Sequence, residues 1–210
     1  MNKEDSIKEK FKQALQSTYK VISEDYKVGK NKKKDEKIYS VGEIDNILDK
    51  NQFKKLRAET DSEALKRRFS NRKLLNKNSP KNPSCRTLYH LAEKVRYELL
   101  GSEMLKGVSK NFKDNYKYRL QSFKHEKISK KEDTNLIDAF EIYMTNKFFN
   151  VELSNENKEI LKFWENDFNK SIEKHIDFLT KNLENQEVYN AKFSEILQSM
   201  DIFENDDTTE

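Results

Sequence analysis

Few residues of this chain have the types and spacing that catalytic chemistry requires. The three histidines, His90, His125 and His175, lie far apart and form no His-Glu-x-x-His motif. The single cysteine, Cys85, has no partner for the paired thiolates of a zinc site. Four scattered glycines are too few for a phosphate-binding loop. The sequence therefore predicts no catalytic, cofactor-binding or metal-binding residues in this chain.

Several individual residues admit a functional and a structural interpretation, and the structural one is favoured in each case. His90 is interpreted as a surface or packed histidine rather than a ligand, and Cys85 as a partly buried residue rather than a reactive thiol. Trp164 shares an apolar stripe with Phe168, which favours core packing over a cofactor platform. The basic stretch 30–34 favours a solvated linker, because no aromatic residues interrupt it.

The elements that must position these residues are helices. With only 4 Gly and 2 Pro, the chain has few signals for tight turns. Its 13 Phe and 9 Tyr supply the apolar area for a core. Apolar residues recur at steps of three and four, which predicts an all-α fold of about six amphipathic helices in an irregular bundle. The patterns cover about residues 4–24, 61–75, 84–101, 105–116, 132–150, 155–183 and 188–200.

Capping residues and stripes sharpen these expectations. Ser84 is placed to cap the helix that follows two prolines, and Gly101 is placed to end it. After Ser154 we expect one long helix of about 43 Å at the usual rise per residue. The residues expected to be buried in the core are Leu88, Val95, Leu99, Trp164 and Phe168.

Charge and composition bound the organisation of the chain. With 41 basic and 37 acidic residues the net charge is only +4, which is typical of solvated helix faces. Residues 1–200 are expected to form one helical domain that includes a basic linker at 27–37 and a short strand-like piece at 37–41. Residues 201–210 carry acidic and no basic side chains, which predicts a disordered acidic tail or linker. No signal peptide or apolar span of about 20 residues is found, so we expect a cytoplasmic protein with no membrane contact.

A series of short motifs runs along the chain in a recognisable order. The richest lies between Ala92 and Val108 and reads Arg-x-Glu, then Gly-Ser, then Leu-x-Gly-Val. Its residues, taken as candidates for partner binding, are Arg96, Glu98, Gly101, Ser102, Gly107 and Val108. The other motifs are FKQAL at 11–15, DSEAL at 61–65, FW at 163–164, NQ at 185–186 and ILQSMDI at 196–202.

In this order the motifs resemble the N-terminal helical domain of the CobT-type subunit of aerobic, ATP-dependent cobaltochelatase. Leu105 stands where that family commonly has Met. The resemblance implies a non-catalytic subunit that works with a CobS-type AAA+ ATPase and a large CobN-type subunit. The complex uses ATP, Mg and cobalt, and it inserts cobalt into hydrogenobyrinic acid a,c-diamide in aerobic cobalamin biosynthesis. The family's C-terminal von Willebrand A domain has no counterpart in this sequence, which predicts a fragment, a shortened subunit or a remnant.

Two other classes of function stay open at this point. A basic helical nucleic-acid-binding protein would use Lys30–Lys34 and the region 124–131, and its binding would weaken steeply with salt. An orphan helical scaffold would have no remaining partner. Co-purification with an AAA+ ATPase separates the chelatase subunit from the scaffold.

The geometry of a helix limits what the central motif can do. Arg96 and Glu98 are two residues apart, about 200° around a helix, so we expect at most one of them to point into the core. Arg96 is expected to pair with an internal carboxylate or with a partner, and a fold-stabilising ion pair is the alternative. Gly101 and Gly107 are expected either to fix a turn that a partner recognises or only to cap two helices.

Overall fold

The computed structural model describes residues 3–24, 39–42, 49–121 and 128–200. These residues confirm the all-α class, and no strand occurs among them. The α-helices are α1 (Lys3–Ile22), α2 (Lys50–Phe69), α3 (Arg72–Lys77), α4 (Pro83–Met104), α5 (Lys106–Gln121), α6 (Leu136–Phe149), α7 (Asn155–Lys162), α8 (Glu165–Ile172), α9 (Ile176–Lys181) and α10 (Gln186–Gln198). Two short 3₁₀ helices, η1 (Lys131–Asp133) and η2 (Glu173–His175), complete the set. The expected linker at 27–37 and the acidic tail at 201–210 lie outside the described residues.

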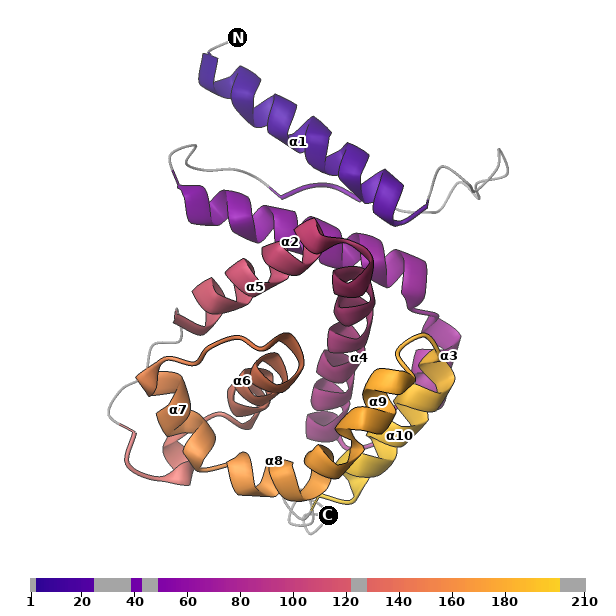
Figure 1. The fold of residues 1–210 in the computed structure, drawn as a ribbon, viewed down its shortest axis with the longest axis vertical. Coiled ribbons are helices and arrows are strands. Elements are labelled where there is room, and N and C mark those ends of the chain that lie inside the picture. The colour runs from indigo at the N-terminus through magenta and orange to yellow at the C-terminus, as the bar shows by residue number, and fades with distance from the viewer. Residues whose placement is uncertain (1–2, 25–38, 43–48, 122–127, 201–210) are drawn as a thin grey trace.

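Helix α4 is the central element of the bundle. It packs against α2, α5, α6 and α10, so most of its faces are covered by other helices. Figure 1 shows α4 with its C-terminal end beside α2 and the later helices around its lower half. Leu88, Tyr89 and Ala92 are fully buried on it. Because other helices enclose α4, several of its polar side chains are buried as well and must find hydrogen-bond partners inside the bundle.

Helix α1 forms an outer layer over α2. It is held there by a small apolar cluster of Leu15, Val41 and Leu56. Phe11 and Phe53 pack against this cluster, and their rings meet each other edge to face. Residues 39–42 lie between the two helices and are not in a strand, which corrects the expectation for their part of 37–41. Lys37 and Ile38 lie outside the described residues.

The segment expected to be one long helix is broken into α7, α8, η2 and α9. The amides of Phe163 and Trp164 bond to carbonyls three residues back, so the helix tightens and turns there. Steps of four residues advance an apolar stripe by about 40° each, so the stripe would drift off one face of a straight helix. The breaks let Ile160, Phe168 and Leu179 all reach the core.

Two other boundaries differ from the expectations. The pattern at 61–75 is split, because the side chain of Asn71 caps the separate helix α3 by accepting from the amides of Lys73 and Leu74. Asn82, not Ser84, caps α4, and Pro83 takes the first helical position, where its missing N–H costs nothing.

The residues expected to form the core lie in two environments. Leu88, Val95 and Phe168 are buried. Leu99 and Trp164 are only partly buried, although both pack against the core. The Trp164 indole N–H donates to the hydroxyl of Thr134, which sits near the surface, and Lys131 lies over its ring. This polar edge explains why Trp164 stops short of full burial.

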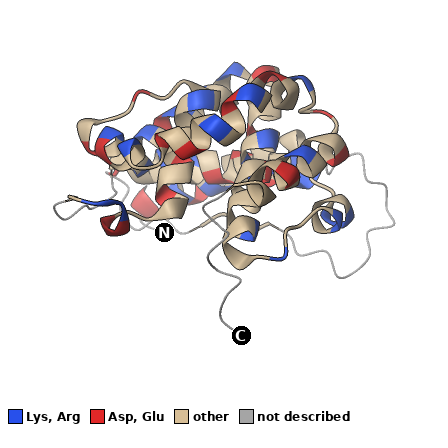
Figure 2. Ribbon diagram, turned by 90° about the horizontal axis from the view of Figure 1, so that it is seen from below, with Lys and Arg blue, Asp and Glu red and all other residues tan. Residues whose placement is uncertain are grey.

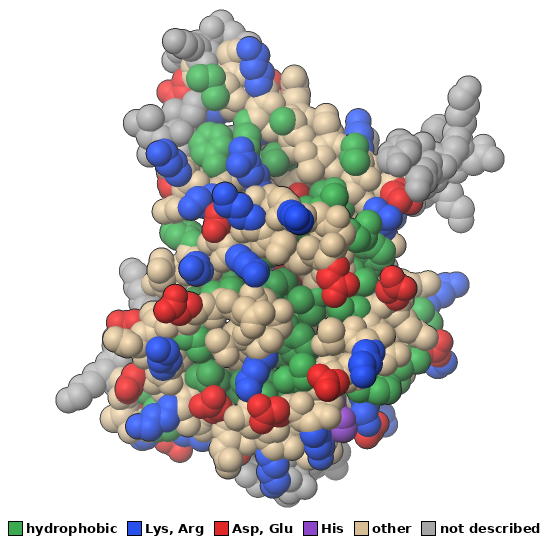
Figure 3. Space-filling view, viewed as in Figure 1, with side chains coloured by type: hydrophobic (Ala, Val, Ile, Leu, Met, Phe, Trp, Pro, Cys, Tyr) green, Lys and Arg blue, Asp and Glu red, His purple; other side chains and the backbone are tan. Residues whose placement is uncertain are grey.

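Charged residues of both signs cover the outside of the bundle. Figure 2 shows Lys and Arg interleaved with Asp and Glu along most helices, and Figure 3 shows the same mixture over one face. Many of these side chains form ion pairs, such as Lys192–Glu195 at 2.8 Å. Within the described residues no helix has both the length and the apolar character to cross a membrane.

The two glycines of the central motif have different surroundings. Gly101 was expected to end α4, but it lies inside this helix. No described glycine has a positive φ. A Cβ added to Gly101 would lie 2.2 Å from Cδ1 of Leu65 on α2, so glycine is required for close packing. A Cβ added to Gly107 would meet nothing within 4 Å.

Gly101→Ala should therefore destabilise the fold by about 1–3 kcal/mol, because Leu65 is itself buried and cannot move aside freely. Gly107→Ala is the matched control and should be neutral or stabilising by up to about 1 kcal/mol. Urea unfolding measures both. If the two substitutions have equal effects, the close approach of α2 and α4 is not a constraint.

Candidate functional site

The motif residues on α4 are buried together with residues of three other segments. Arg96 is 1% exposed and Glu98 is 2% exposed, so both point into the protein. This corrects the expectation that at most one of them would do so. The physical reason is that α4 is covered on nearly opposite sides, so residues 200° apart can both be buried.

Arg96 forms a bidentate ion pair with Glu93, one turn earlier on α4. Its Nε and one terminal nitrogen donate to the two carboxylate oxygens of Glu93, at 2.8 and 2.9 Å. The remaining contacts go to backbone carbonyls, those of Leu183 at 2.7 Å and Phe69 at 2.6 Å. Arg96 therefore joins α4 to the end of α2 and to the turn before α10. It pairs with an internal carboxylate, one of the two alternatives left open by the sequence.

Glu93 extends these contacts to α3 and α10. Its carboxylate also accepts from the hydroxyl of Ser70 at 2.7 Å and from the side-chain amide of Gln186 at 3.1 Å. Gln186 in turn bonds to both the backbone N–H and the carbonyl of Asn71. We call Arg96, Glu93, Gln186, Ser70 and Asn71 the Arg96 network.

A second buried group, the Glu98 network, lies further along α4. Glu98 accepts hydrogen bonds from the hydroxyls of Ser62 on α2 at 2.6 Å and Tyr116 on α5 at 2.5 Å. Lys94 lies 3.8 Å from the same carboxylate. Burial and the nearby Glu98 charge raise the pKa of Tyr116 well above its ordinary value of 10.0, so this hydroxyl stays protonated and donates.

The remaining motif residues are spread between the interior and the surface. Val108 is buried on α5, and Ser102 is half-buried with no hydrogen-bond partner for its hydroxyl within the described part of the chain. Met104 and Leu105 are about half exposed, at 47% and 43%, and Gly107 beside them is also exposed. The exposed part of the motif is thus the corner between α4 and α5.

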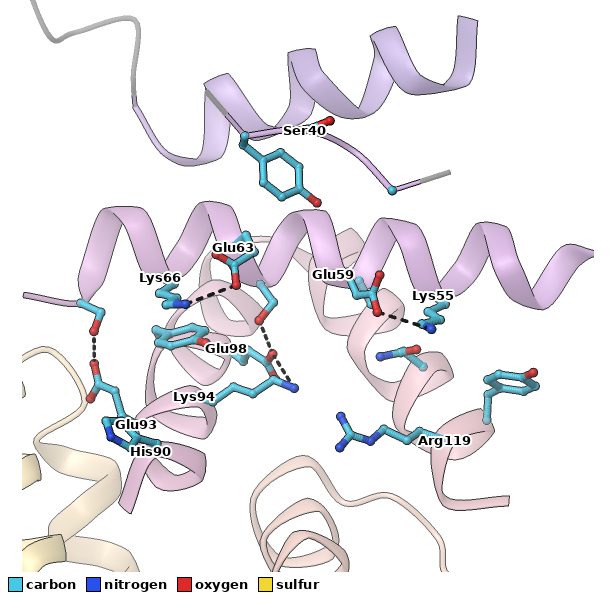
Figure 4. A pocket seen from close by; sticks show the side chains of 18 of the residues that line it. Ser40, Lys55, Glu59, Glu63, Lys66, His90, Glu93, Lys94, Glu98 and Arg119 are labelled. Atoms are coloured by element: carbon cyan, nitrogen blue, oxygen red, sulfur yellow. Dashed lines mark hydrogen bonds and ion pairs between the residues drawn. The ribbon is translucent and has the colours of Figure 1, made fainter. Parts of the chain in front are cut away.

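A groove of about 950 Å³ runs along the outside of these networks, between α2, α4 and α5 (Figure 4). Lysines and glutamates alternate on its wall and pair with one another, as Lys55–Glu59, Lys66–Glu63 and Lys94–Glu98. Arg119 at its end pairs with Glu141 at 2.8 Å. Because the charges compensate within the wall, the groove presents no surplus of either sign to a charged ligand.

The histidines and the cysteine do not come together. His90 lines the groove, where burial lowers its pKa below 6.5, and His175 lies on η2. Cys85 is buried, and His125 lies outside the described residues. In the described ranges no group of three or more His, Cys, Asp or Glu is placed to hold a metal ion.

Most of the basic residues considered for nucleic-acid binding are not described by the structure. Lys30–Lys34 and Lys124 lie outside the described residues. Lys131 is described, and it pairs with Asp167 at 2.7 Å while its ammonium lies over Trp164. This lysine is engaged within the fold.

The fold and its networks define an all-α helical module, whose buried polar groups hold the helices together. The family model for cobalamin biosynthesis protein CobT matches residues 5–210. The chain therefore belongs to the CobT family, which implies a role in cobalamin biosynthesis. No curated protein and no solved structure matches the chain.

Sequence reasoning missed several of the residues that complete these networks. Glu93 precedes Arg96 by three residues, which is the spacing of a helical ion pair and was a readable signal. Glu98 is hydrogen-bonded to Ser62 and Tyr116, which lie 36 and 18 residues away in the sequence. No local sequence pattern predicts contacts at such separations.

Replacing Arg96 should be far more damaging than replacing Lys192, a partly buried lysine that pairs with an exposed glutamate at the same spacing. Arg96→Met leaves the carboxylate of Glu93 buried without its cation, so we expect a loss of about 3–5 kcal/mol of unfolding free energy. Lys192→Met breaks the Lys192–Glu195 pair, in which Glu195 is exposed, and should cost less than about 1 kcal/mol. Chemical denaturation of both variants measures the contrast, and equal losses would contradict the account.

Glu141 on α6 gives a prediction about pH. Desolvation raises its pKa above 4.5, against the weaker opposite effect of Arg119, and its Oε1 has no hydrogen-bond partner in the described part of the chain. The folded state thus holds this proton more tightly than the unfolded chain does. The stability that Glu141 contributes is present below about pH 4.5 and is lost as the pH rises through the folded-state pKa.

The unfolding free energy of the wild type minus that of Glu141→Gln should therefore decrease as the pH rises from about 4.5. Glu195→Gln is the control of opposite sign, because the hydrogen bond from Lys192 lowers the pKa of Glu195. Urea unfolding from about pH 4 to pH 8 tests both. A difference for Glu141 that is constant or increases with pH would show that its burial does not govern its protonation.

Proposed function

We propose that this chain is a non-catalytic accessory subunit of the cobaltochelatase complex, or part of one. In this role it supports the insertion of cobalt into hydrogenobyrinic acid a,c-diamide. The observation that carries the proposal is the CobT family match over residues 5–210. ATP, Mg²⁺ and cobalt would be handled by the other subunits. The buried networks support this division of labour, because their charged groups are paired internally and serve packing.

The expected partners are an AAA+ ATPase subunit of the CobS type and a large subunit of the CobN type. For the ATPase contact we propose the corner between α4 and α5. Arg96, Glu98 and Gly101 are too buried to touch a partner. Met104 and Leu105 expose apolar area directly beside them, and exposed large apolar side chains at such a corner are suited to a protein interface.

A binding assay with the ATPase subunit from the same organism tests this assignment. Leu105→Asp should weaken binding at least tenfold, because it places a charge in an apolar contact. Phe178→Asp is the matched control, since Phe178 is also 43% exposed but lies on α9. It should bind as the wild type does.

Two results would contradict the proposal. If the wild-type chain does not bind the ATPase subunit at all, this chain is not the contact between them. If Leu105→Asp and Phe178→Asp bind equally well, the corner is not the interface. Thermal unfolding of both variants verifies that neither result reflects loss of the fold.

A further inference from the structure

Helix α5 carries a row of four lysines on one side. Lys106, Lys110, Lys113 and Lys117 follow one another at steps of four, three and four residues, so they lie within about 60° around the helix. All four are exposed. The opposite side of α5 buries Phe112 in the core. We call these four residues the lysine row.

The lysine row differs from several other lysines of the fold in having no acidic partner among the described residues. Among the described residues none of the four forms an ion pair, whereas Lys8, Lys147 and Lys192 all do. Like charges three or four positions apart repel and weaken an isolated helix by about 0.2–0.5 kcal/mol per pair. The row therefore concentrates uncompensated positive charge at a small cost to the helix.

The lysine row also lines a cleft. All four lysines border a hollow of about 490 Å³, whose other wall is Asn150, Val151 and Glu152, between α6 and α7. Figure 1 shows this connecting segment passing beside α5. Met104 and Leu105 precede Lys106 directly, so exposed apolar area adjoins one end of the row.

We propose that the lysine row binds an acidic, extended segment of a protein partner, with an apolar residue of that segment against Met104 and Leu105. Successive lysines of the row rise by about 6, 4.5 and 6 Å along α5, and alternate side chains of an extended chain repeat at about 6.6 Å. The long lysine side chains bridge the offset of about 3 Å over the whole row. Carboxylates at alternate positions can thus each meet a lysine. The inference goes beyond the chelatase role, because it rests on the charge and spacing of the row. It shares Met104 and Leu105 with the ATPase contact proposed above, so the acidic segment and the ATPase subunit compete for this corner unless the segment belongs to that subunit.

A protein segment fits this cleft better than a nucleic acid does. Single-stranded nucleic acids are bound where basic grooves carry aromatic side chains for stacking, and no aromatic residue lines this cleft. Asp114 and Glu152 border it as well, so the positive charge of the cleft is interrupted; a peptide can place uncharged residues opposite these two carboxylates, whereas a nucleic acid carries a phosphate at every step. The adjoining apolar corner suits a side chain of a peptide.

The test uses a fluorescein-labelled peptide in which glutamate and serine alternate after an initial phenylalanine, with binding to the full chain followed by fluorescence anisotropy. The variant combines Lys110→Gln, Lys113→Gln and Lys117→Gln. Its control combines Lys158→Gln, Lys162→Gln and Lys181→Gln, which removes the same charge from exposed positions of α7 and α9.

We expect the row variant to bind the peptide about tenfold more weakly, because each exposed ion pair contributes a factor of about two. The control variant should bind as the wild type does, and added salt should weaken wild-type binding. Removing the repelling lysines should leave the thermal stability of the row variant unchanged or slightly raised, so weaker binding cannot be ascribed to unfolding.

Three results would overturn the inference. The first is no peptide binding by the wild type at low salt. The second is equal weakening in the row and control variants, which would indicate attraction by net charge alone. The third is tighter binding of a labelled single-stranded oligonucleotide than of the peptide, lost in the row variant, which would assign the row to nucleic acid. None of these results depends on the ATPase assay above.

Discussion

The guanidinium of Arg96 is almost wholly removed from water, and an arginine buried in this way must have its donors paired. Glu93 neutralises its charge and accepts from two of its five N–H donors, and the carbonyls of Phe69 and Leu183 each accept from one more. Because these partners lie at the end of α2 and before α10, the pairing fixes where both elements meet α4. The ion pair is costly to break, and its geometric demand specifies one arrangement of the helices.

The motifs that run along the sequence meet one another around α4. Ser62, in the DSEAL motif at 61–65 on α2, donates to Glu98, and Leu65 of the same motif packs against Gly101. Gln186, from the motif at the start of α10, bonds to Glu93. These contacts explain the motifs as parts of one buried arrangement. They also separate the residues that maintain the fold from the exposed corner at Leu105 and the lysine row, which remain free to meet partners.

The all-α class could be predicted from the sequence because scarce glycine and periodic apolar residues are local signals. The interior site could be predicted only in part. Arg96 was singled out, but its neighbours in space come from segments 27 and 87 residues away. The break at Trp164 was missed because the apolar stripe runs through it without a proline or glycine. The role of Gly101 depends on Leu65 across the helix pair, which no local pattern contains.

A double-mutant cycle between Arg96→Met and Glu93→Met tests the central claim most directly, because it isolates the pairwise interaction from the other contacts of each residue. The account predicts that the double variant loses less stability than the two single variants together, by at least about 2 kcal/mol. Each single variant leaves a buried charge unpaired, whereas the double variant leaves none. Additive losses would contradict the account, because they would mean that Arg96 and Glu93 act independently and that this pair does not organise the bundle.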